Sequence, residues 1–475
     1  MSEVPASIRQ AYDPERFRAD GHRLIDALAD QLAGWHGREG RALPWRAPAD
    51  SRHAWDDLAG GELVADLMAV ARASTALAHP RCMGHQVPPP LPGAALAELA
   101  AALLNNGMAV YEMGPAATPI ELTVVDWMCR QLGLPDGAGG VLTSGGSLGN
   151  LTALLAMRQA HAGFDVWREG AHAGPRLAVI ASSDAHYSVA RTLRVMGWGD
   201  GGAIAAQVDG AHRMTRAAVE AALATAGDRR VIGIVAAAGS TATGAFDPLD
   251  ELADLAAERG LWLHVDAAHG GGFALSPTHR YKLAGLGRAD SVVFDAHKLL
   301  MMPALITAVL FRRGGHAYEA FAQQASYLFA ASAPSTTWWD LGQRTLECTK
   351  RAMAVEVWSA LRAHGAAWFG EVIDRLCALA AALAARVAAA PDFELALAPE
   401  ANIVCYRHTG AAELDVHNRA LRQRVVEDGR FYIVGTQLPR GYFLRSTIMN
   451  PLTEERDLDE LLDHLRTLGR ARCQE

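Results

Sequence analysis

The chain has 475 residues, half of them hydrophobic, and a formal net charge of −8 at pH 7. This length exceeds that of one ordinary domain, so we expect a large domain with smaller terminal parts. The acidic balance lacks the basic surplus that binding to phosphate backbones requires, which argues against nucleic acid as a partner.

The cysteines are scattered along the chain without a CxxC pair: Cys82, Cys129, Cys348, Cys377, Cys405 and Cys473. This spacing fits neither a disulfide framework nor a zinc site, so we predict no metal and a reducing, cytoplasmic location. The N-terminal sequence lacks the basic start and apolar run of a signal peptide. The apolar stretch CALAAALAARVAAA is shorter than a membrane span and contains Arg386, so no membrane association is expected.

Residues 1–90 are predicted to form an N-terminal helical arm. The segment FRADGHRLIDALADQLAGW is helix-like and carries no chemistry that we identify. The proline run in HPRCMGHQVPPPLPG must be irregular, because proline lacks a backbone donor and fixes φ. We therefore place a boundary near residue 90.

Residues 91–365 alternate strands with helices. The segments RLAVIAS, VIGIVAAA, LWLHV and SVVF are almost continuously apolar, which is typical of a parallel sheet covered on both faces. The segment DPLDELADLAAERG has helical period, an Asp-Pro start and a closing glycine, so it supplies a crossover. Residues 366–475 add a long Ala-rich helix and the strand-like pieces NIVCYR and YFLRSTI. The fold class is therefore predicted as α/β, with a large domain built on a mostly parallel mixed sheet and a small C-terminal α+β domain.

Polar residues follow the C-terminal ends of four of these strands, where open α/β sheets bind ligands. In chain order they are Ser183, Asp184, His186 and Tyr187; Ser240, Thr241 and Thr243; Asp266 and Ala268; and Asp295, His297 and Lys298. We interpret them as one site, because four such ends in order, with a lysine last, are hard to explain as caps and turns alone.

Lys298 and Asp266 suit a cofactor that carries an aldehyde on a pyridine ring. A lysine amine forms an imine with an aldehyde, and an acid against the pyridine nitrogen keeps the ring protonated and electron-withdrawing. His186 can stack on the ring opposite the small Ala268, and His297 can donate to a phosphate. Taken singly, an aspartate here is more often a helix cap, a lysine a surface residue, and each histidine a structural one.

A glycine-rich turn precedes an amphipathic helix in LTSGGSLGNLTALLAMRQA. Backbone N–H groups and the helix dipole at such a turn bind anions. Ser144, Gly145, Gly146 and Ser147 are therefore candidate ligands of the cofactor phosphate. A Gly-Gly turn that only starts a helix is about equally compatible with the pattern.

The segments TSGGSLGN, SDAHYS, AGSTATGAFDPL, HVDAAHGG and DAHK, in this order, resemble the group II decarboxylases. These are pyridoxal-phosphate enzymes that act on glutamate, cysteine sulfinate, 2,4-diaminobutyrate and aromatic amino acids. The stretches NNGMAVYEMGPAAT and QRTLECTKR are most similar to the bacterial 2,4-diaminobutyrate decarboxylase branch. The resemblance implies the fold-type I architecture of the aspartate aminotransferase-like enzymes, pyridoxal 5'-phosphate as cofactor, and a homodimer with the active site at its interface.

The same resemblance implies roles for individual residues. Lys298 is implied as the imine lysine, Asp266 as the partner of the pyridine nitrogen, and His186 as the residue stacked on the ring. Further cofactor contacts are implied for Gly146, Ser147, Thr241, Asp295 and His297.

Substrate binding is implied for residues outside these motifs. Arg445 in YFLRSTIMNP is similar to the family arginine that pairs with the substrate α-carboxylate, and a guanidinium fork suits a carboxylate. Positions that line the substrate pocket, often from the partner subunit, are implied for His79, Pro80, His85, Gln86 and Tyr111.

The chain departs from the family in the loop whose tyrosine protonates the α-carbon. By spacing, that position falls near Ser335, with Trp338 and Trp339 close by in the sequence. His186, a water and Tyr327 stay open as donors. Related enzymes without this tyrosine divert the reaction to oxygen and release an aldehyde.

The predicted activity is decarboxylation of an L-amino acid to its amine and CO2, with diamino acids as the first substrate class, acidic ones second and aromatic ones third. An aminotransferase or a carbon–carbon lyase on the same fold would share Lys298, Asp266 and the phosphate turn. A non-catalytic binding protein would not need these residues together with His186 and Arg445.

A second departure from the family is His269, at a position where the family often has an aromatic residue. No consequence is assigned to it.

Overall fold

A computed structural model describes residues 4–321 and 338–470, which fall into two compact units. The sheet unit comprises residues 86–321, 338–381 and 397–404, and the terminal unit comprises residues 4–85, 382–396 and 405–470. The N-terminal arm thus groups with the C-terminal segment rather than standing alone. The division into 1–90, 91–365 and 366–475 stays a prediction.

The described part of the sheet unit contains a seven-stranded sheet in the order β1-β7-β6-β5-β4-β2-β3. Its strands are β1 (Gly139–Thr143), β2 (Leu177–Ser182), β3 (Ala203–Ala206), β4 (Arg230–Ala237), β5 (Trp262–Asp266), β6 (Ser291–Asp295) and β7 (Thr307–Phe311). Neighbours from β6 to β3 run parallel, whereas β7 runs antiparallel to both β6 and β1. The predicted α/β class with a mostly parallel mixed sheet is confirmed.

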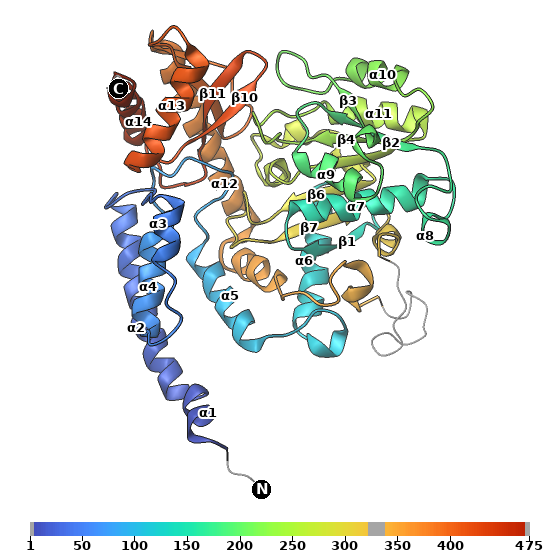
Figure 1. Cartoon of the computed structure of the whole chain (residues 1–475). Helices are drawn as coiled ribbons and strands as arrows, with labels where there is room; N and C mark the ends of the chain where they lie inside the picture. The colour runs from blue at the N-terminus through green and yellow to red at the C-terminus, as the bar shows by residue number, and fades with distance from the viewer. Residues whose placement is uncertain (1–3, 322–337, 471–475) are drawn as a thin grey trace. The chain divides into compact units, whose positions relative to one another are not determined.

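The apolar segments form this sheet because side chains on both of its faces are buried. Every residue of β2, β6 and β7 is buried. In Figure 1, α7 (Gly146–His161) lies beside the strands, and it packs on β4, β5, β6 and β7 and against α9 (Tyr187–Val195). The core between these elements includes Leu154, Met157, Val179 and Trp262.

The crossover α11 (Leu249–Arg259) follows its predicted punctuation. It begins directly after Pro248 and carries two acidic residues in its first turn. Their negative charges are stabilised by the positive end of the helix dipole. It ends at Gly260, whose φ of 62° is left-handed. The other helices of the unit are α5 (Pro92–Leu104), α6 (Ala117–Gln131), α8 (Val166–Glu169), α10 (Arg216–Ala224) and the first part of α12 (Ala354–Ala389), with short 3-10 turns such as η1 (Tyr111–Met113) and η3 (Gly270–Leu275).

The terminal unit begins with the helices α1 (Ala6–Ala11), α2 (Pro14–His36), α3 (Pro48–His53) and α4 (Leu63–Ala73), of which α2 and α4 pack together. A four-stranded sheet follows in the order β10-β11-β9-β8: β8 (Phe393–Leu395), β9 (Ile403–His408), β10 (Val434–Leu438) and β11 (Gly441–Thr447). Helices α13 (Leu414–Asp428) and α14 (Glu455–Arg470) complete it. Among the described residues, no helix has the length and apolarity to cross a membrane.

Candidate active site

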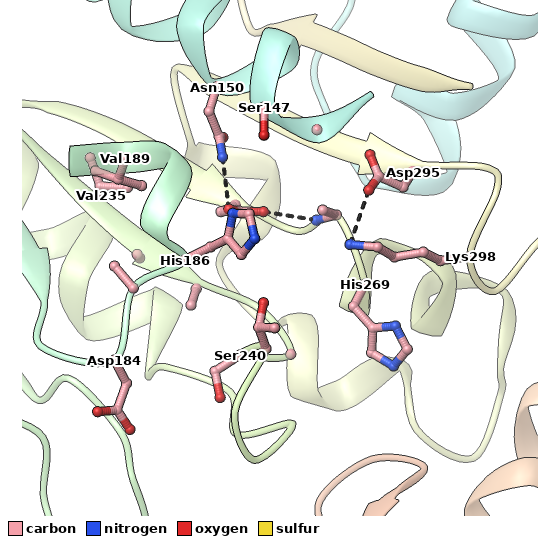
Figure 2. A pocket seen from close by; sticks show the side chains of 18 of the residues that line it. Ser147, Asn150, Asp184, His186, Val189, Val235, Ser240, His269, Asp295 and Lys298 are labelled. Carbon is pink, nitrogen blue, oxygen red and sulfur yellow. Dashed lines mark hydrogen bonds and ion pairs between the residues drawn. The ribbon is translucent and has the colours of Figure 1, made fainter. Parts of the chain in front are cut away.

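A pocket lies at the C-terminal ends of β2, β4, β5 and β6, beside the N-terminus of α7 (Figure 2). Its volume is about 160 Å³, close to the roughly 150 Å³ of a cavity known to hold one benzene ring. Candidate residues from all four strand ends and from the glycine-rich turn line it: Gly146, Ser147, His186, Thr241, Asp266, Ala268, Asp295, His297 and Lys298. The four strand ends therefore meet at one place, while the role of each residue stays a prediction.

Lys298 points its amine into this pocket and pairs with Asp295. The distance from Lys298 Nζ to Asp295 Oδ2 is 3.0 Å (Figure 2). Asp295 Oδ1 accepts a hydrogen bond of 2.6 Å from Thr307 Oγ1, and His297 Nε2 lies 3.5 Å from Oδ2. Because Asp295 is buried, these polar partners offset the loss of water around its charge. The pairing holds the lysine amine at the pocket wall.

Asp266 ends β5, and its two oxygens have different partners. Oδ1 accepts from the backbone N–H of Ala268 at 3.2 Å. This bond caps the local turn, a common structural role of aspartate. Oδ2 accepts from Nδ2 of Asn150, a residue of α7, at 2.9 Å (Figure 2). The carboxylate therefore has the oriented, hydrogen-bonded setting that a partner for a pyridinium nitrogen needs.

His186 caps the N-terminus of α9 and faces the same pocket. Its Nδ1 lies 2.7 Å from Ser188 Oγ and accepts from the backbone N–H of Ser188 at 3.3 Å. Burial lowers the pKa of His186, and the ammonium of Lys298 lowers it further against the opposing effect of Asp266. The imidazole is therefore predominantly neutral at pH 7, as suits a ring that stacks on an aromatic cofactor.

The glycine-rich turn brings the N-terminus of α7 to the pocket. Gly145 has a φ of 107°, a conformation that side-chain-bearing residues rarely adopt, and it carries no side chain to cap the helix. A Cβ on Gly146 would lie 3.2 Å from Asp295 Oδ2. Both glycines thus let the helix start close to the Lys298–Asp295 pair, where its dipole favours an anion.

Ser144, the other candidate of this turn, has a different environment. Its Oγ donates to Glu347 Oε1 at 2.9 Å, and it lines a second cavity with Leu305 and Thr349. The side chain of Ser144 is thus engaged outside the candidate site, so a phosphate contact through this hydroxyl is not supported.

The candidate substrate residues divide between the two units. Arg445, in β11, is buried in the terminal unit, and burial lowers the pKa of its guanidinium. His85 belongs to the same unit, and burial followed by the charge of Arg445 lowers its pKa. Gln86 and Tyr111 belong to the sheet unit but do not line the pocket. Their substrate roles stay predictions.

The candidate donor Tyr327 and Ser335, near which the position of the family tyrosine falls, lie outside the described residues. Trp338 is exposed and makes an edge contact with Trp339, with ring centroids 5.3 Å apart.

His79, the other histidine near the proline run, is fully buried, and its Nδ1 accepts from the backbone N–H of Arg81 at 3.1 Å.

The sequence reasoning missed several polar residues that shape the site. Asn150 follows Gly146 by four residues on α7, so both occupy one helix face, and that spacing was a usable signal. Thr307 is the direct partner of Asp295 in the pairing of β6 with β7, which no local pattern reveals. His269, already noted as a departure from the family, lines the pocket, and its Nε2 lies 2.7 Å from Asn402 Oδ1.

Comparison with known proteins agrees with this geometry. Residues 81–409 match the family model described as the pyridoxal-dependent decarboxylase conserved domain. The chain is 32% identical to cysteine sulfinic acid decarboxylase of Rattus norvegicus over 84% of each protein. It is 31% identical to L-2,4-diaminobutyrate decarboxylase of Rhizobium meliloti, over 82% of this chain and 78% of that protein.

Solved structures show the same likeness. The crystal structure of mouse CSAD in apo form matches with a TM-score of 0.89 and 27% identity, covering 97% of this chain and all of that one. A Vibrio parahaemolyticus structure, titled as the glutamate decarboxylase domain of a diaminobutyrate-pyruvate transaminase and L-2,4-diaminobutyrate decarboxylase, matches with a TM-score of 0.82 and 26% identity over 95% of each chain.

Proposed function

Because the chain belongs to the pyridoxal-dependent decarboxylase family and uses pyridoxal phosphate as its cofactor, we propose that its substrate is a small diamino acid resembling 2,4-diaminobutyrate. The products are then the corresponding diamine and CO2. An acidic amino acid is the second substrate class, since relatives at similar identity are named for cysteine sulfinic acid and for acidic amino acids.

The residues of the pocket fit this cofactor. The cavity has room for an aromatic ring, and a lysine amine, an oriented carboxylate and a helix N-terminus surround that space. Lys298 would hold the aldehyde carbon covalently, Asp266 would hold a proton at the ring nitrogen, and His186 would lie against the ring face. The first turn of α7 would bind the phosphate.

The bound cofactor supplies an electron-withdrawing ring that accepts the electron pair left when the carboxyl group departs. The protein contributes orientation and electrostatics around that ring. Arg445 would bind the α-carboxylate, because a guanidinium fork matches its two oxygens.

The charge of the pocket wall supports a cationic substrate side chain. Asp184, Asp266 and Asp295 line the pocket, and Lys298 is the only lysine or arginine among the described lining residues. Asp266 would face the ring nitrogen and Asp295 pairs with Lys298, which leaves Asp184 as the carboxylate available to a second amine. The hydrogen bond of 2.6 Å between Asp184 Oδ2 and His212 Nδ1 holds it in position. This observation carries the preference for a diamino acid over an acidic one.

Oxidative deamination to an aldehyde is the second candidate activity. It is favoured by the sequence, in which the position of the expected loop tyrosine falls near Ser335. In that reaction one amino acid, one O2 and one water yield the aldehyde, CO2, ammonia and hydrogen peroxide. The proton donor for the simple decarboxylation stays open between His186, a water and Tyr327.

Assembly and location belong to the same proposal. A homodimer with the active site at its interface follows from the family, and substrate residues from the partner subunit would complete the pocket. Every cysteine of residues 4–321 and 338–470 is a free thiol, which supports a reducing, cytoplasmic setting.

The test is a product analysis of the purified holoenzyme with a panel of L-amino acids, following CO2, amine, aldehyde and peroxide. We expect CO2 and amine in equal amounts from one diamino acid. Aldehyde with peroxide would establish the second candidate. Faster CO2 release from an acidic amino acid would overturn the diamino preference, and transfer of the amino group to an added keto acid without CO2 would point to an aminotransferase.

A further inference from the structure

A continuous series of hydrogen bonds leads from the core of the sheet unit to the candidate site. Trp262 Nε1 lies 2.8 Å from Ser291 Oγ, which lies 2.8 Å from His264 Nδ1. His264 Nε2 lies 2.9 Å from Asn150 Oδ1, and Asn150 Nδ2 lies 2.9 Å from Asp266 Oδ2. The first four residues are all buried, so water does not compete for these bonds.

The carboxylate at one end of this series determines the direction of the bonds from Asp266 to His264 Nε2. A carboxylate only accepts, so Asn150 must direct its Nδ2 hydrogens to Asp266 and its Oδ1 to His264. His264 Nε2 must then carry a hydrogen to donate to that oxygen. An indole N–H only donates, so Ser291 Oγ accepts from Trp262, and its own hydrogen is available to the Nδ1 of a neutral His264. A neutral His264 is therefore the tautomer with its proton on Nε2.

Burial supports the same protonation state. His264 is fully buried, and desolvation lowers its pKa to about 4 against the opposing effect of Asp266. A neutral imidazole has one donor and one acceptor, which are the two roles that Asn150 and Ser291 require of it.

The series branches at Asn150 and reaches a second candidate residue. The same Nδ2 lies 2.9 Å from Ser188 Oγ, which lies 2.7 Å from His186 Nδ1. Since Ser188 Oγ accepts from the amide, its own hydrogen is available to His186 Nδ1. The neutral His186 ring then carries its proton on Nε2, a tautomer that the backbone N–H of Ser188 also favours because it donates to Nδ1. One amide thus contacts the Asp266 carboxylate and, through Ser188, supports the tautomer of His186.

We propose that His264 is a positioning residue of the active site, which orients the Asn150 amide, through it holds Asp266 toward the cofactor nitrogen, and supports through Ser188 the His186 tautomer protonated on Nε2. The inference rests on the roles proposed above for Asp266 and His186. His264 touches neither cofactor nor substrate in this account. A buried leucine would fill its place without donating to Asn150, and the amide would lose the constraint that keeps Nδ2 on Asp266.

The experiment compares His264→Leu, which removes the donor, with His264→Gln, whose amide N–H can replace Nε2–H. The matched control is His316→Leu, because His316 packs on Trp262 with ring centroids 4.9 Å apart but lies outside the series. Asp266→Asn is the reference for loss of the carboxylate itself. For each variant we would measure the affinity of the apoenzyme for pyridoxal phosphate, the absorbance of the bound cofactor against pH, kcat and KM.

We expect His264→Leu to weaken cofactor affinity and lower kcat by about 10-fold to 100-fold, because an unconstrained Asn150 amide no longer holds its buried hydrogen bond to the Asp266 carboxylate. KM should change little, His264→Gln should recover most of the loss, and His316→Leu should leave affinity, spectrum and kcat near wild type. Equal values for His264→Leu and wild type, with Asp266→Asn impaired, would overturn the positioning role. An unimpaired Asp266→Asn would instead overturn the assignment of Asp266, and this proposal with it.

A second measurement reads the tautomer of His264 in the wild-type protein. Nitrogen NMR of the imidazole rings in the wild-type apoenzyme reports the tautomer directly, and His264→Gln identifies the signal. We expect a neutral ring protonated on Nε2 for His264 at pH 7. A ring protonated on Nδ1, or on both nitrogens, contradicts the proposed direction of the series.

Discussion

Thr307 donates from Oγ1 to Oδ1 of Asp295 at 2.6 Å, and the two residues are direct partners in the antiparallel pairing of β6 with β7. The other oxygen of Asp295 lies 3.0 Å from Lys298 Nζ. A threonine on a neighbouring strand thus orients the carboxylate that holds the candidate cofactor lysine.

Replacing Thr307 with valine should therefore weaken this arrangement while keeping the shape of the side chain. We expect the free energy of unfolding to fall by about 1–3 kcal/mol, because one oxygen of a buried carboxylate loses its donor. Thr307→Ser keeps the hydroxyl and should lose less. Urea unfolding of both apoproteins measures the difference, and equal stability of the two variants would contradict the role of the hydroxyl.

Lys298→Ala should abolish the covalent absorbance band of the bound cofactor and lower activity by about a thousandfold or more, because the covalent anchor is lost. The check is an absorbance spectrum of the variant with added pyridoxal phosphate, recorded beside wild type. Lys282→Ala is a suitable control, since Lys282 does not line the pocket. An unchanged band in Lys298→Ala would remove Lys298 from its role.

Arg445→Lys should raise KM by about tenfold or more while leaving the spectrum of the bound cofactor unchanged. Lysine keeps the charge but loses the planar fork that binds both oxygens of a carboxylate. Steady-state kinetics with the identified substrate provide the measurement. A change in the cofactor spectrum with an unchanged KM would show that Arg445 acts on the cofactor instead.

Acid should destabilise the fold through His264. Burial lowers the pKa of this histidine from 6.5 to about 4. Between these values the unfolded chain binds a proton that the folded chain excludes, so stability is full above pH 6.5 and falls as the pH drops toward 4. From pH 7 to pH 5 this histidine should remove about 2 kcal/mol from the free energy of unfolding. Urea unfolding at both pH values should show a smaller loss for His264→Gln, and an identical loss would rule out this contribution.

Glu121 and Lys350 form a buried ion pair that should be strongly coupled. Lys350 also donates to the backbone carbonyl of Leu142, and Glu121 accepts from the backbone N–H of Leu142 at 3.0 Å. Burial lowers the pKa of Lys350. Lys350→Met should cost about 3–5 kcal/mol, because it leaves an unpaired buried carboxylate.

Adding Glu121→Leu to Lys350→Met should recover part of that loss, since the orphaned charge is removed as well. A double-mutant cycle of unfolding free energies measures the coupling. Additive effects of the two substitutions would mean that the charges act independently.

The positions of the strand ends were predictable because their signals are local. Apolar runs such as RLAVIAS and SVVF specify buried strands, and the polar residues behind them specify a ligand edge. Lys298 and Asp266 could thus be assigned to one site from the sequence, and both line the same pocket. The turn at Gly145 also has a local signal, because glycine adopts its positive φ more readily than other residues.

The partners of these residues were not predictable, because hydrogen bonds between strands and helices depend on register and packing. His264 lies in the apolar segment LWLHV, and nothing nearby in the sequence shows that its ring meets Asn150, 114 residues away. The hydroxyl of Ser144 is another case, since Glu347 lies 203 residues from it.

The sequence by itself determined the order of the elements and the α/β class and indicated the candidate residues of the site, because periodicity, turns and motifs are encoded within short segments. Only the tertiary structure decided which oxygen of Asp266 faces Asn150, which partner holds Asp295 and which histidine tautomer the core requires. Those choices depend on donors and acceptors meeting across the folded sheet, where the loss of water makes each unsatisfied group costly.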